Sequence, residues 1–432
     1  MIRPTVPQNS TIGERAALIS AVVDAMAADL TSFAQDLVRI PSLPGEEAPA
    51  HEYVAETLRA LGLSVDIVES RFDELRSHPA FNDDGLRPEG RINVVGRWPG
   101  TGGTHSRSLI LNGHLDVVSA GNPALWTDPP FAAVVRAGRM YGRGACDMKS
   151  GVTAAIFAVR ALRRLGRSPG GDVFIQTVSG EESGGVGTLT TIVKGYRADA
   201  AIILEPTRLR MCPIQSGALT FRLRIEGRSI HACMKRLGIS AIEKACYLIG
   251  NLNEFDRRRH AAHPSPHYPD ALNVAPISVG TLSAGDWHST VPHEATLEGR
   301  CGVFAGESID DTKRAFAAAI RDACAADPWL REHPPVLEWF EGQFESGETD
   351  RNAPILRELA ASHQAIAGEA PGIEGVTYGS DLRLFTNHAN IPAVLYGPGD
   401  VANAHTVDEF IELEDVITAT KVLALTIDTW CE

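Results

Sequence analysis

A histidine and an aspartate end one hydrophobic stretch of the chain, LILNGHLDVV at residues 109–118. Side chains of a β-strand alternate between its two faces, so His114 and Asp116 are expected on the same side, with Leu115 on the other. An imidazole beside a carboxylate is either a buried hydrogen-bonded pair or a metal ligand that a second residue orients. Both interpretations remain open on this stretch alone.

Four further stretches place acidic or imidazole groups where an apolar run ends. They are GRGACDMKSG with Asp147, VSGEESGG with Glu181 and Glu182, AIILEPT with Glu205, and VANAHTVDE with His405. Ligands of open α/β sheets bind beyond the carboxyl ends of the strands, which is where these groups are expected. Each residue taken alone is explained equally well as a turn, cap or surface group, but the shared position at strand ends favours one common site.

The adjacent glutamates 181 and 182 need a positive partner, because two buried carboxylates repel each other and lose hydration. The segment QTVSGEESGGVGT that carries them contains no Lys or Arg. A mixed imidazole and carboxylate ligand set suits Zn²⁺ and, less selectively, Mn²⁺ or Co²⁺. We therefore expect two divalent metal ions per chain, zinc first, with the ligand candidates His114, Asp147, Glu182, Glu205 and His405.

The remaining pattern predicts an α/β fold with an inserted domain. Up to about residue 212, apolar strands alternate with helices, which is typical of a mostly parallel sheet with helices on both faces. Residues 213–347 follow the order β-α-β-β-α-β of a ferredoxin-like α+β unit. The prediction is a catalytic domain formed by residues 1–212 and 348–432, interrupted by a domain at 213–347.

The charge and cysteine content of the chain argue against several classes of binding partner and location. The 432 residues carry a net charge of −14 without a cluster of Lys and Arg, so nucleic acid and anionic membranes are poor partners. The seven cysteines are odd in number and form no CxxC pair, which indicates reduced thiols. Neither an apolar leader nor a run of about 18 apolar residues is found, so we expect a cytoplasmic protein that acts on a small molecule.

The motifs NGHLDVV, GRGACDMKSG, SGEESGG, LEPT and AHTVDE resemble, in order, those of the co-catalytic zinc aminoacylase, glutamate carboxypeptidase, acetylornithine deacetylase and succinyl-diaminopimelate desuccinylase family. The resemblance spans about residues 30–425 and implies a metal-dependent hydrolase that cleaves an amide-type C–N bond of a small N-acyl amino acid or related carboxylate. The alternatives are a deaminase or deformylase with the same site, acting on an amino-aromatic acid or a formamide, and a metal-binding homologue without catalysis. Segment 213–347 is similar to the family's lid and dimerisation domain, which implies a homodimer.

The resemblance also implies a role for each ligand candidate. Asp147 would bridge both metal ions. His114 and Glu205 would complete one metal site, and Glu182 and His405 would complete the other. The peptide bond after the bridging aspartate is usually cis in this family, so a cis bond is expected after Asp147.

Three residues would carry catalysis if the resemblance holds. Glu181 would be the general base for a metal-bridged water and would then protonate the leaving amine. Asp116 would orient His114 through its second ring nitrogen. His231, in EGRSIHACMK, resembles the lid histidine that reaches the partner subunit's site as an oxyanion donor. Because an inactive relative is expected to lose the base, Glu181 argues against the non-catalytic alternative.

The substrate side departs from the family pattern. The residues after His231 read ACMKRLGIS instead of a loop with glycine and proline, and positions 233–236 either line a pocket or lie on the lid surface. Arg300 resembles the lid arginine that grips a carboxylate, a group that its guanidinium fits well. The segments TYGSDLRLF and YGPGD resemble a late substrate loop and a set of backbone donors. The substrate-binding candidates are Arg300, Ser289, Ser380, Asp381, Arg383 and Gly397.

Overall fold

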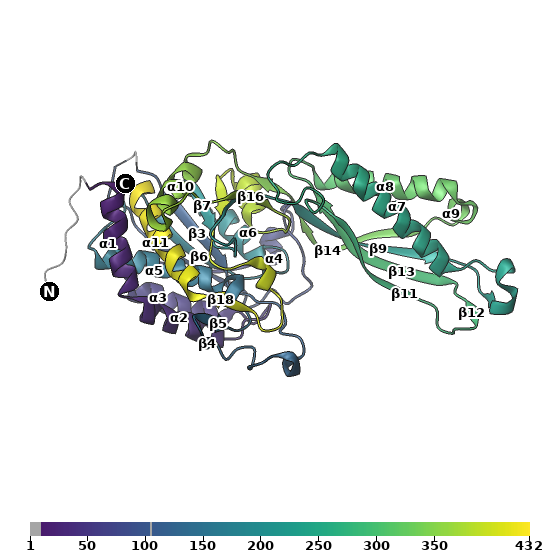
Figure 1. The fold of residues 1–432 in the computed structure, drawn as a ribbon, viewed down its shortest axis with the longest axis horizontal. Helices are drawn as coiled ribbons and strands as arrows, with labels where there is room; N and C mark the ends of the chain where they lie inside the picture. The colour runs from purple at the N-terminus through teal and green to yellow at the C-terminus, as the bar shows by residue number, and fades with distance from the viewer. Residues whose placement is uncertain (1–9, 104–105) are drawn as a thin grey trace. The chain divides into compact units, whose positions relative to one another are not determined.

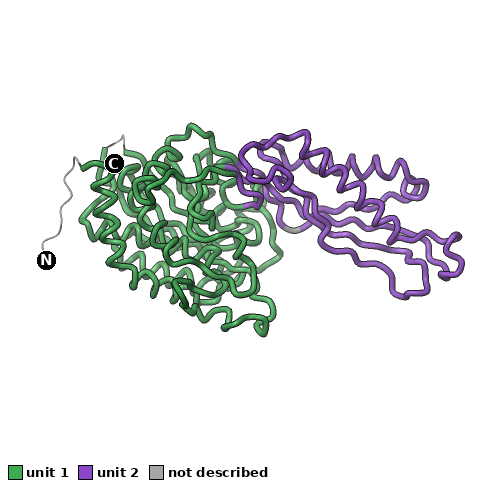
Figure 2. Tube along the Cα trace, viewed as in Figure 1, with its two compact units in different colours: residues 1–213, 348–374, 380–432 green, residues 214–347, 375–379 purple. Residues whose placement is uncertain are grey.

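A computed structural model describes residues 10–103 and 106–432. The chain divides into two compact units (Figure 2). Unit 1 comprises residues 1–213, 348–374 and 380–432, and unit 2 comprises residues 214–347 and 375–379. The chain therefore returns to unit 2 once more after residue 374, a crossing that the sequence pattern did not reveal.

The larger sheet has nine strands, and its four central strands β6, β3, β7 and β17 run parallel (Figure 1). This centre confirms the predicted α/β fold. Strand β1 is antiparallel to β2, β2 is antiparallel to β6, and β8 is antiparallel to β17. The connection between β1 and β2 carries no long crossover helix, which a parallel pair would need. The strands are β1 (Ser64–Glu69), β2 (Ile92–Trp98), β6 (Val173–Val178), β3 (Leu109–His114), β7 (Ala200–Ile203), β17 (Ala393–Leu395), β8 (Met211–Gln215) and β15 (Gly347–Glu348), with β16 (Ile373–Val376) beside β8.

Helices bury the central strands. Every residue of β3 and β6 is buried, as expected for strands covered on both faces. Among the described residues, no single helix is long and apolar enough to cross a membrane, and only α1 with α2, bent by 61°, passes as a pair. The helices of unit 1 are α1 (Ile12–Asp24), α2 (Ala27–Arg39), α3 (Ala48–Ala60), α4 (Phe72–Leu75), α5 (Ser150–Arg164), α6 (Val186–Val193), α10 (Pro354–Ala367) and α11 (Leu413–Trp430).

Unit 2 has an antiparallel sheet in the order β11-β13-β9-β14, the order of a ferredoxin-like unit. Strand β9 alternates between buried and less buried residues, and its buried Phe221 lies 4.7 Å from the ring of Phe316 on α8. A short ribbon of β10 and β12 carries His231. The elements are β9 (Gly217–Glu226), β10 (Ile230–His231), η3 (Ala232–Leu237), α7 (Ala241–Ala262), β11 (Ile277–Ala284), β12 (Thr290–Val291), β13 (Glu294–Val303), α8 (Ile309–Ala326), α9 (Pro328–Glu332) and β14 (Val336–Phe344).

A third, small sheet in unit 1 joins distant parts of the sequence. Its order is β18-β5-β4, formed by β18 (Phe410–Glu412), β5 (Arg139–Tyr141) and β4 (Val134–Arg136). Strand β18 pairs antiparallel with β5, with Phe410 opposite Tyr141. This pairing brings the late segment that contains His405 to the segment that contains Asp147.

Candidate metal centre and active site

Four of the predicted site residues lie at or just after the carboxyl ends of neighbouring parallel strands. His114 is the last residue of β3, Glu181 and Glu182 follow β6, and Glu205 follows β7. Since β6, β3 and β7 are adjacent and parallel, their carboxyl ends meet at one edge of the sheet. The fold thus brings together side chains that are far apart in the sequence.

The other two ligand candidates come from irregular backbone. Asp147 lies in η2 (Ala145–Lys149), a kinked turn before α5, and the peptide bond between Asp147 and Met148 is cis, as expected. His405 follows η5 (Val401–Asn403) and has a left-handed backbone with φ of 60°. Both side chains reach the edge where β3, β6 and β7 end.

The ligand candidates form two groups that share Asp147. One group is His114, Asp147 and Glu205, and the other is Asp147, Glu182 and His405. Within each group, one potential ligand atom per residue lies within 4.8 Å of the others. Oδ1 of Asp147 is 3.1 Å from Nε2 of His114, and Oδ2 is 3.4 Å from Nε2 of His405. Each carboxylate oxygen therefore faces one group, as a bridge between two metal ions requires.

The electrostatics of the site call for positive charge. Burial, and then the charge of Glu205, raises the pKa of Glu181, while burial and Asp147 raise the pKa of Glu205. Hydrogen bonds to Asp147 and Glu182 raise the pKa of His405 to about 10. Divalent cations fit this donor set, because imidazole nitrogens and carboxylate oxygens bind them and their charge offsets the buried carboxylates.

The protonation of His114 follows from its partners. Nδ1 of His114 lies 2.8 Å from the main-chain oxygen of Asp116, which accepts hydrogen bonds only. Nδ1 therefore carries a proton, and Nε2, which faces Asp147, would be the ligand atom with a metal ion in place.

Asp116 orients its neighbours differently from the prediction. The carboxylate oxygen Oδ1 is 3.7 Å from Nδ1 of His114, so the main-chain carbonyl orients the ring. The other oxygen, Oδ2, accepts a hydrogen bond of 3.0 Å from the N–H of Glu182. The two-residue alternation did not extend to Asp116 because β3 ends at His114. The Asp116 carboxylate holds the Glu182 loop in place.

The loop that carries Glu181 and Glu182 has supports that sequence reasoning missed. The Ser183 hydroxyl donates a hydrogen bond of 2.7 Å to Asp84, which also pairs with the buried guanidinium of Arg91. Asp84 and Arg91 belong to the long connection between β1 and β2. That connection has no hydrophobic period and no motif, so no sequence signal pointed to it.

The late loop, expected to bind substrate, is buried. Ser380, Asp381 and Arg383 are at most 1% exposed. The Ser380 hydroxyl accepts a hydrogen bond from the N–H of Leu382, and Nη2 of Arg383 donates one of 2.8 Å to the main-chain oxygen of Gly184. These contacts make Arg383 a support of the Glu181–Glu182 loop, and the role of Ser380, Asp381 and Arg383 toward a substrate stays a prediction.

Gly397 was expected to offer its backbone N–H to the substrate, but this group already has a partner inside the protein. Its N–H donates a hydrogen bond of 3.1 Å to the Thr207 hydroxyl. A Cβ atom at this position would lie 2.5 Å from the main-chain oxygen of Glu205. The residue therefore allows close packing against the strand end that carries Glu205, and its amide is used inside the protein.

The three remaining candidates belong to unit 2. His231 is exposed on β10, and its Nδ1 accepts a hydrogen bond of 3.2 Å from the N–H of Cys233. Residues 233–236 lie in η3 and are all exposed in the single chain. Ser289 precedes β12, and Arg300 lies on β13, where its Nη2 donates a hydrogen bond of 3.0 Å to the Thr377 oxygen.

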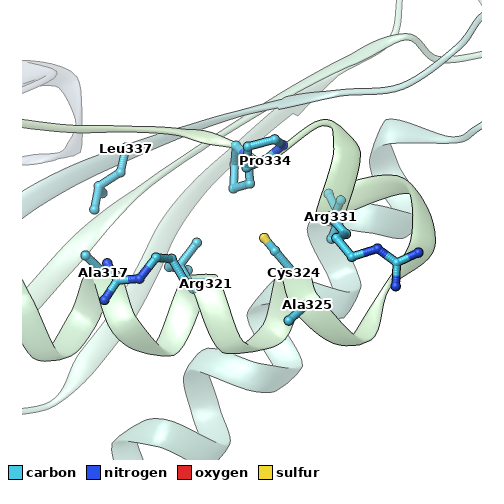
Figure 3. Close-up of a pocket in the computed structure, with 10 residues that line it drawn as sticks. Ala317, Arg321, Cys324, Ala325, Arg331, Pro334 and Leu337 are labelled. Carbon is cyan, nitrogen blue, oxygen red and sulfur yellow. The ribbon is translucent and has the colours of Figure 1, made fainter.

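A separate cavity of about 310 Å³ lies in unit 2, between α8, α9 and the start of β14 (Figure 3). Apolar groups such as Leu337 and Cys324 line it, and the guanidinium of Arg331 points away from it (Figure 3). The described residues that line this cavity include neither a carboxylate nor an imidazole.

Comparison with known proteins agrees with the geometry of this edge. Residues 110–429, which include every ligand candidate, match the family described as peptidase family M20/M25/M40. The chain belongs to this family. The family match and the two ligand groups identify a metal-dependent hydrolase of amide-type C–N bonds and confirm the resemblance seen in the motifs.

The relatives of this M20 chain differ in substrate. A Halalkalibacterium halodurans protein named N-formyl-4-amino-5-aminomethyl-2-methylpyrimidine deformylase is 31% identical over 437 residues, covering 95% of this chain and 96% of the relative. A probable succinyl-diaminopimelate desuccinylase of Staphylococcus aureus is 26% identical over 355 residues, covering 75% and 82%. The crystal structure of human carnosine dipeptidase 1 has the same fold, with a TM-score of 0.73 and 14% identity over 98% and 99% of the two chains.

Proposed function

We propose that this chain is a deformylase that hydrolyses the formamide of a small heteroaromatic amine, such as a formylated aminomethylpyrimidine. The observation that carries the proposal is its similarity to a deformylase over nearly the full length of both proteins. A Bacillus subtilis protein of the same name, 30% identical over 427 residues, supports it. The proposed cofactors are two divalent metal ions, zinc first, with manganese or cobalt as alternatives.

The described residues suit such a hydrolysis. Divalent ions held by the two ligand groups would supply positive charge that polarises the formyl carbonyl and acidifies water. Glu181 would accept a proton from the water that attacks the formyl carbon. As the C–N bond breaks, Glu181 would return that proton to the leaving amine, so that formate and a free amine result. Asp116 and Asp84 would keep the Glu181 loop in register through their bonds to Glu182 and Ser183.

A carboxylate-bearing N-acyl amino acid is the second candidate substrate. The observation that favours it is the Arg300 side chain, whose Nε is buried without a hydrogen-bond partner. A guanidinium N–H left in that state suits a substrate carboxylate. The desuccinylase relatives point to the same class of compound. Under this proposal, His231 and Ser289 would contact substrate.

We also propose a homodimer in the cytoplasm, formed through unit 2. Strand β11 is an edge of its sheet, carries no charged residue and is largely exposed. Such an edge is prone to pair with another chain, and a second copy would cover it. All seven cysteines are unpaired thiols, which suits a reducing compartment. The net charge of −14 argues against nucleic acid as a partner.

One substrate panel tests the proposal. Purified protein loaded with Zn²⁺, Mn²⁺ or Co²⁺ is incubated with a formylated aminomethylpyrimidine, an N-succinyl amino acid and an N-acetyl amino acid. Release of formate, measured with formate dehydrogenase, at a kcat/KM at least tenfold above that for the other compounds supports the deformylase. Preferred release of succinate or acetate overturns it in favour of the second candidate. Absence of turnover with every compound and metal overturns both.

A further inference from the structure

Glu409 is a buried carboxylate that the proposed mechanism does not use. It follows His405 by four residues, and its side chain is 0% exposed. Its oxygen Oε1 accepts two backbone hydrogen bonds, one of 2.8 Å from Cys146 and one of 3.1 Å from Asp147. One carboxylate oxygen therefore binds both peptide N–H groups that lead into the shared ligand Asp147.

The other oxygen of Glu409 is also engaged. Oε2 accepts a hydrogen bond of 2.5 Å from Nη1 of Arg143, which is 3% exposed. The main-chain oxygen of Glu409 accepts a bond of 2.9 Å from Gly142. Glu409 thus contacts the segment 142–147 at both of its ends, and charge-assisted bonds of this kind are the stronger ones. The position of the Asp147 backbone depends on this carboxylate.

The segment that carries Glu409 also carries His405, a member of the second ligand group. His405 and Glu409 are separated by one turn whose Asp408 is bound by the N–H and hydroxyl of Thr127, at 2.8 and 2.7 Å. Nε2 of His405 is 3.4 Å from Oδ2 of Asp147. Glu409 therefore lies between two members of the second group: it accepts a hydrogen bond from the N–H of Asp147, and it follows His405 by four residues.

We propose that Glu409 is a positioning residue that places Asp147 between the two metal ions and so controls whether both ions bind. The inference rests on the two-metal site of the proposed function. Residues that orient metal ligands typically change metal affinity by about 10–100-fold when they are replaced. A scaffold role alone, in which the ion pair of Glu409 with Arg143 only joins the start of β18 to the segment after β5, would change stability and leave metal binding unaltered.

Titration of the metal-free protein with Co²⁺ separates these two roles. Visible absorption gives the stoichiometry, the Kd and the ligand geometry, and circular dichroism gives the Tm without metal. Glu409→Gln, which keeps an accepting oxygen but loses the charge, and Glu409→Asp, which keeps the charge but shortens the reach, are expected to weaken at least one Co²⁺ site by about 10–100-fold. The absorption spectrum is expected to change with them.

A matched control lies three residues away on the same segment. Glu412 pairs with Arg139 at 2.6 Å, but its side chain is 40% exposed. Its partner Arg139 begins β5 and lies outside the segment 142–147 that contains Asp147. Glu412→Gln is expected to bind two Co²⁺ ions with the wild-type Kd and spectrum. If Glu409→Gln and Glu409→Asp fail to fold, Arg143→Lys is titrated in their place, with the same expected weakening.

Two outcomes contradict the inference at different levels. Glu409 variants that bind two Co²⁺ ions with wild-type Kd values and spectrum overturn the positioning role, whatever their Tm. The same result for Arg143→Lys, when that variant replaces them, overturns it too. Wild-type protein that binds no Co²⁺ overturns the metal centre of the proposed function and the inference with it.

Discussion

His51 provides a test of how tightly the support of the catalytic loop is packed. Its ring is fully buried on α3, with Nδ1 at 3.1 Å from the Thr177 hydroxyl and Nε2 at 2.9 Å from the Ser179 hydroxyl. Burial, and then the charge of Lys149, lowers the pKa of His51 from 6.5 to about 3. The folded protein therefore keeps this ring neutral at pH values where the unfolded chain protonates it.

The sign and size of the effect follow from that difference. Because the folded-state pKa is the lower one, the unfolded chain binds the extra proton between pH 6.5 and about 3. Stability from His51 is complete above pH 6.5 and is lost as the pH falls through that window. Each pH unit costs about 1.4 kcal/mol, so about 2 kcal/mol is lost between pH 6.5 and pH 5.0.

Urea unfolding of wild-type protein and His51→Gln, measured without metal from pH 7.5 to pH 5.0, isolates this contribution. The variant is expected to be less stable at pH 7.5, because glutamine fills the site of the ring poorly. The gap is expected to narrow by about 2 kcal/mol at pH 5.0, since the wild type alone loses the His51 contribution. His78→Gln controls for the removal of a half-buried histidine from the same unit. A gap that stays constant or widens towards pH 5.0 would show that folded His51 is protonated, and would refute the reasoning.

Three further predictions concern the site itself. Glu181→Gln is expected to lower kcat by about 10²–10⁴-fold with two metal ions still bound, and mass spectrometry of the metal content checks that the base and not the metal was lost. Asp147→Ala is expected to remove both ions, since both ligand groups contain Asp147, and a variant that retains two would contradict the bridge. Gly180→Ala is expected to cost about 1–3 kcal/mol of stability, because φ is 71° and the new Cβ would lie 2.1 Å from Nη2 of Arg91. Thermal unfolding measures that loss, and Gly195→Ala, with a φ of 90° and open space around it, controls for the backbone term.

The parts of the site that could be predicted are those set by local pattern. His114 and Glu205 end apolar runs that became adjacent parallel strands, so the sequence placed them at one sheet edge. The sequence did not indicate that β1 and β2 form an antiparallel edge, because strand direction depends on how the strands are connected and not on residue type. The role of the Asp116 carboxylate was also missed, since it depends on where β3 stops.

The supports of the site could not be predicted, because they join segments that are distant in the chain. Asp84 meets Ser183 across about a hundred positions, and Glu409 meets Cys146 across a larger separation. Glu409 stood inside the quoted motif AHTVDE, so a signal was present, but only the fold shows which N–H groups it binds. The burial of Arg383 was hidden for the same reason, because its partner Gly184 lies in the loop after β6, far earlier in the chain.

The order of the ligands along the chain has a consequence for biosynthesis. Every residue of the group His114, Asp147 and Glu205 precedes unit 2 in the chain and is synthesised before it, whereas the other group needs His405, which follows unit 2. A chain that is cut or stalled before its last segment therefore retains all three residues of one group and lacks a member of the other. Incomplete translation or proteolysis before His405 would leave a product with all residues of one ligand group and an incomplete second group.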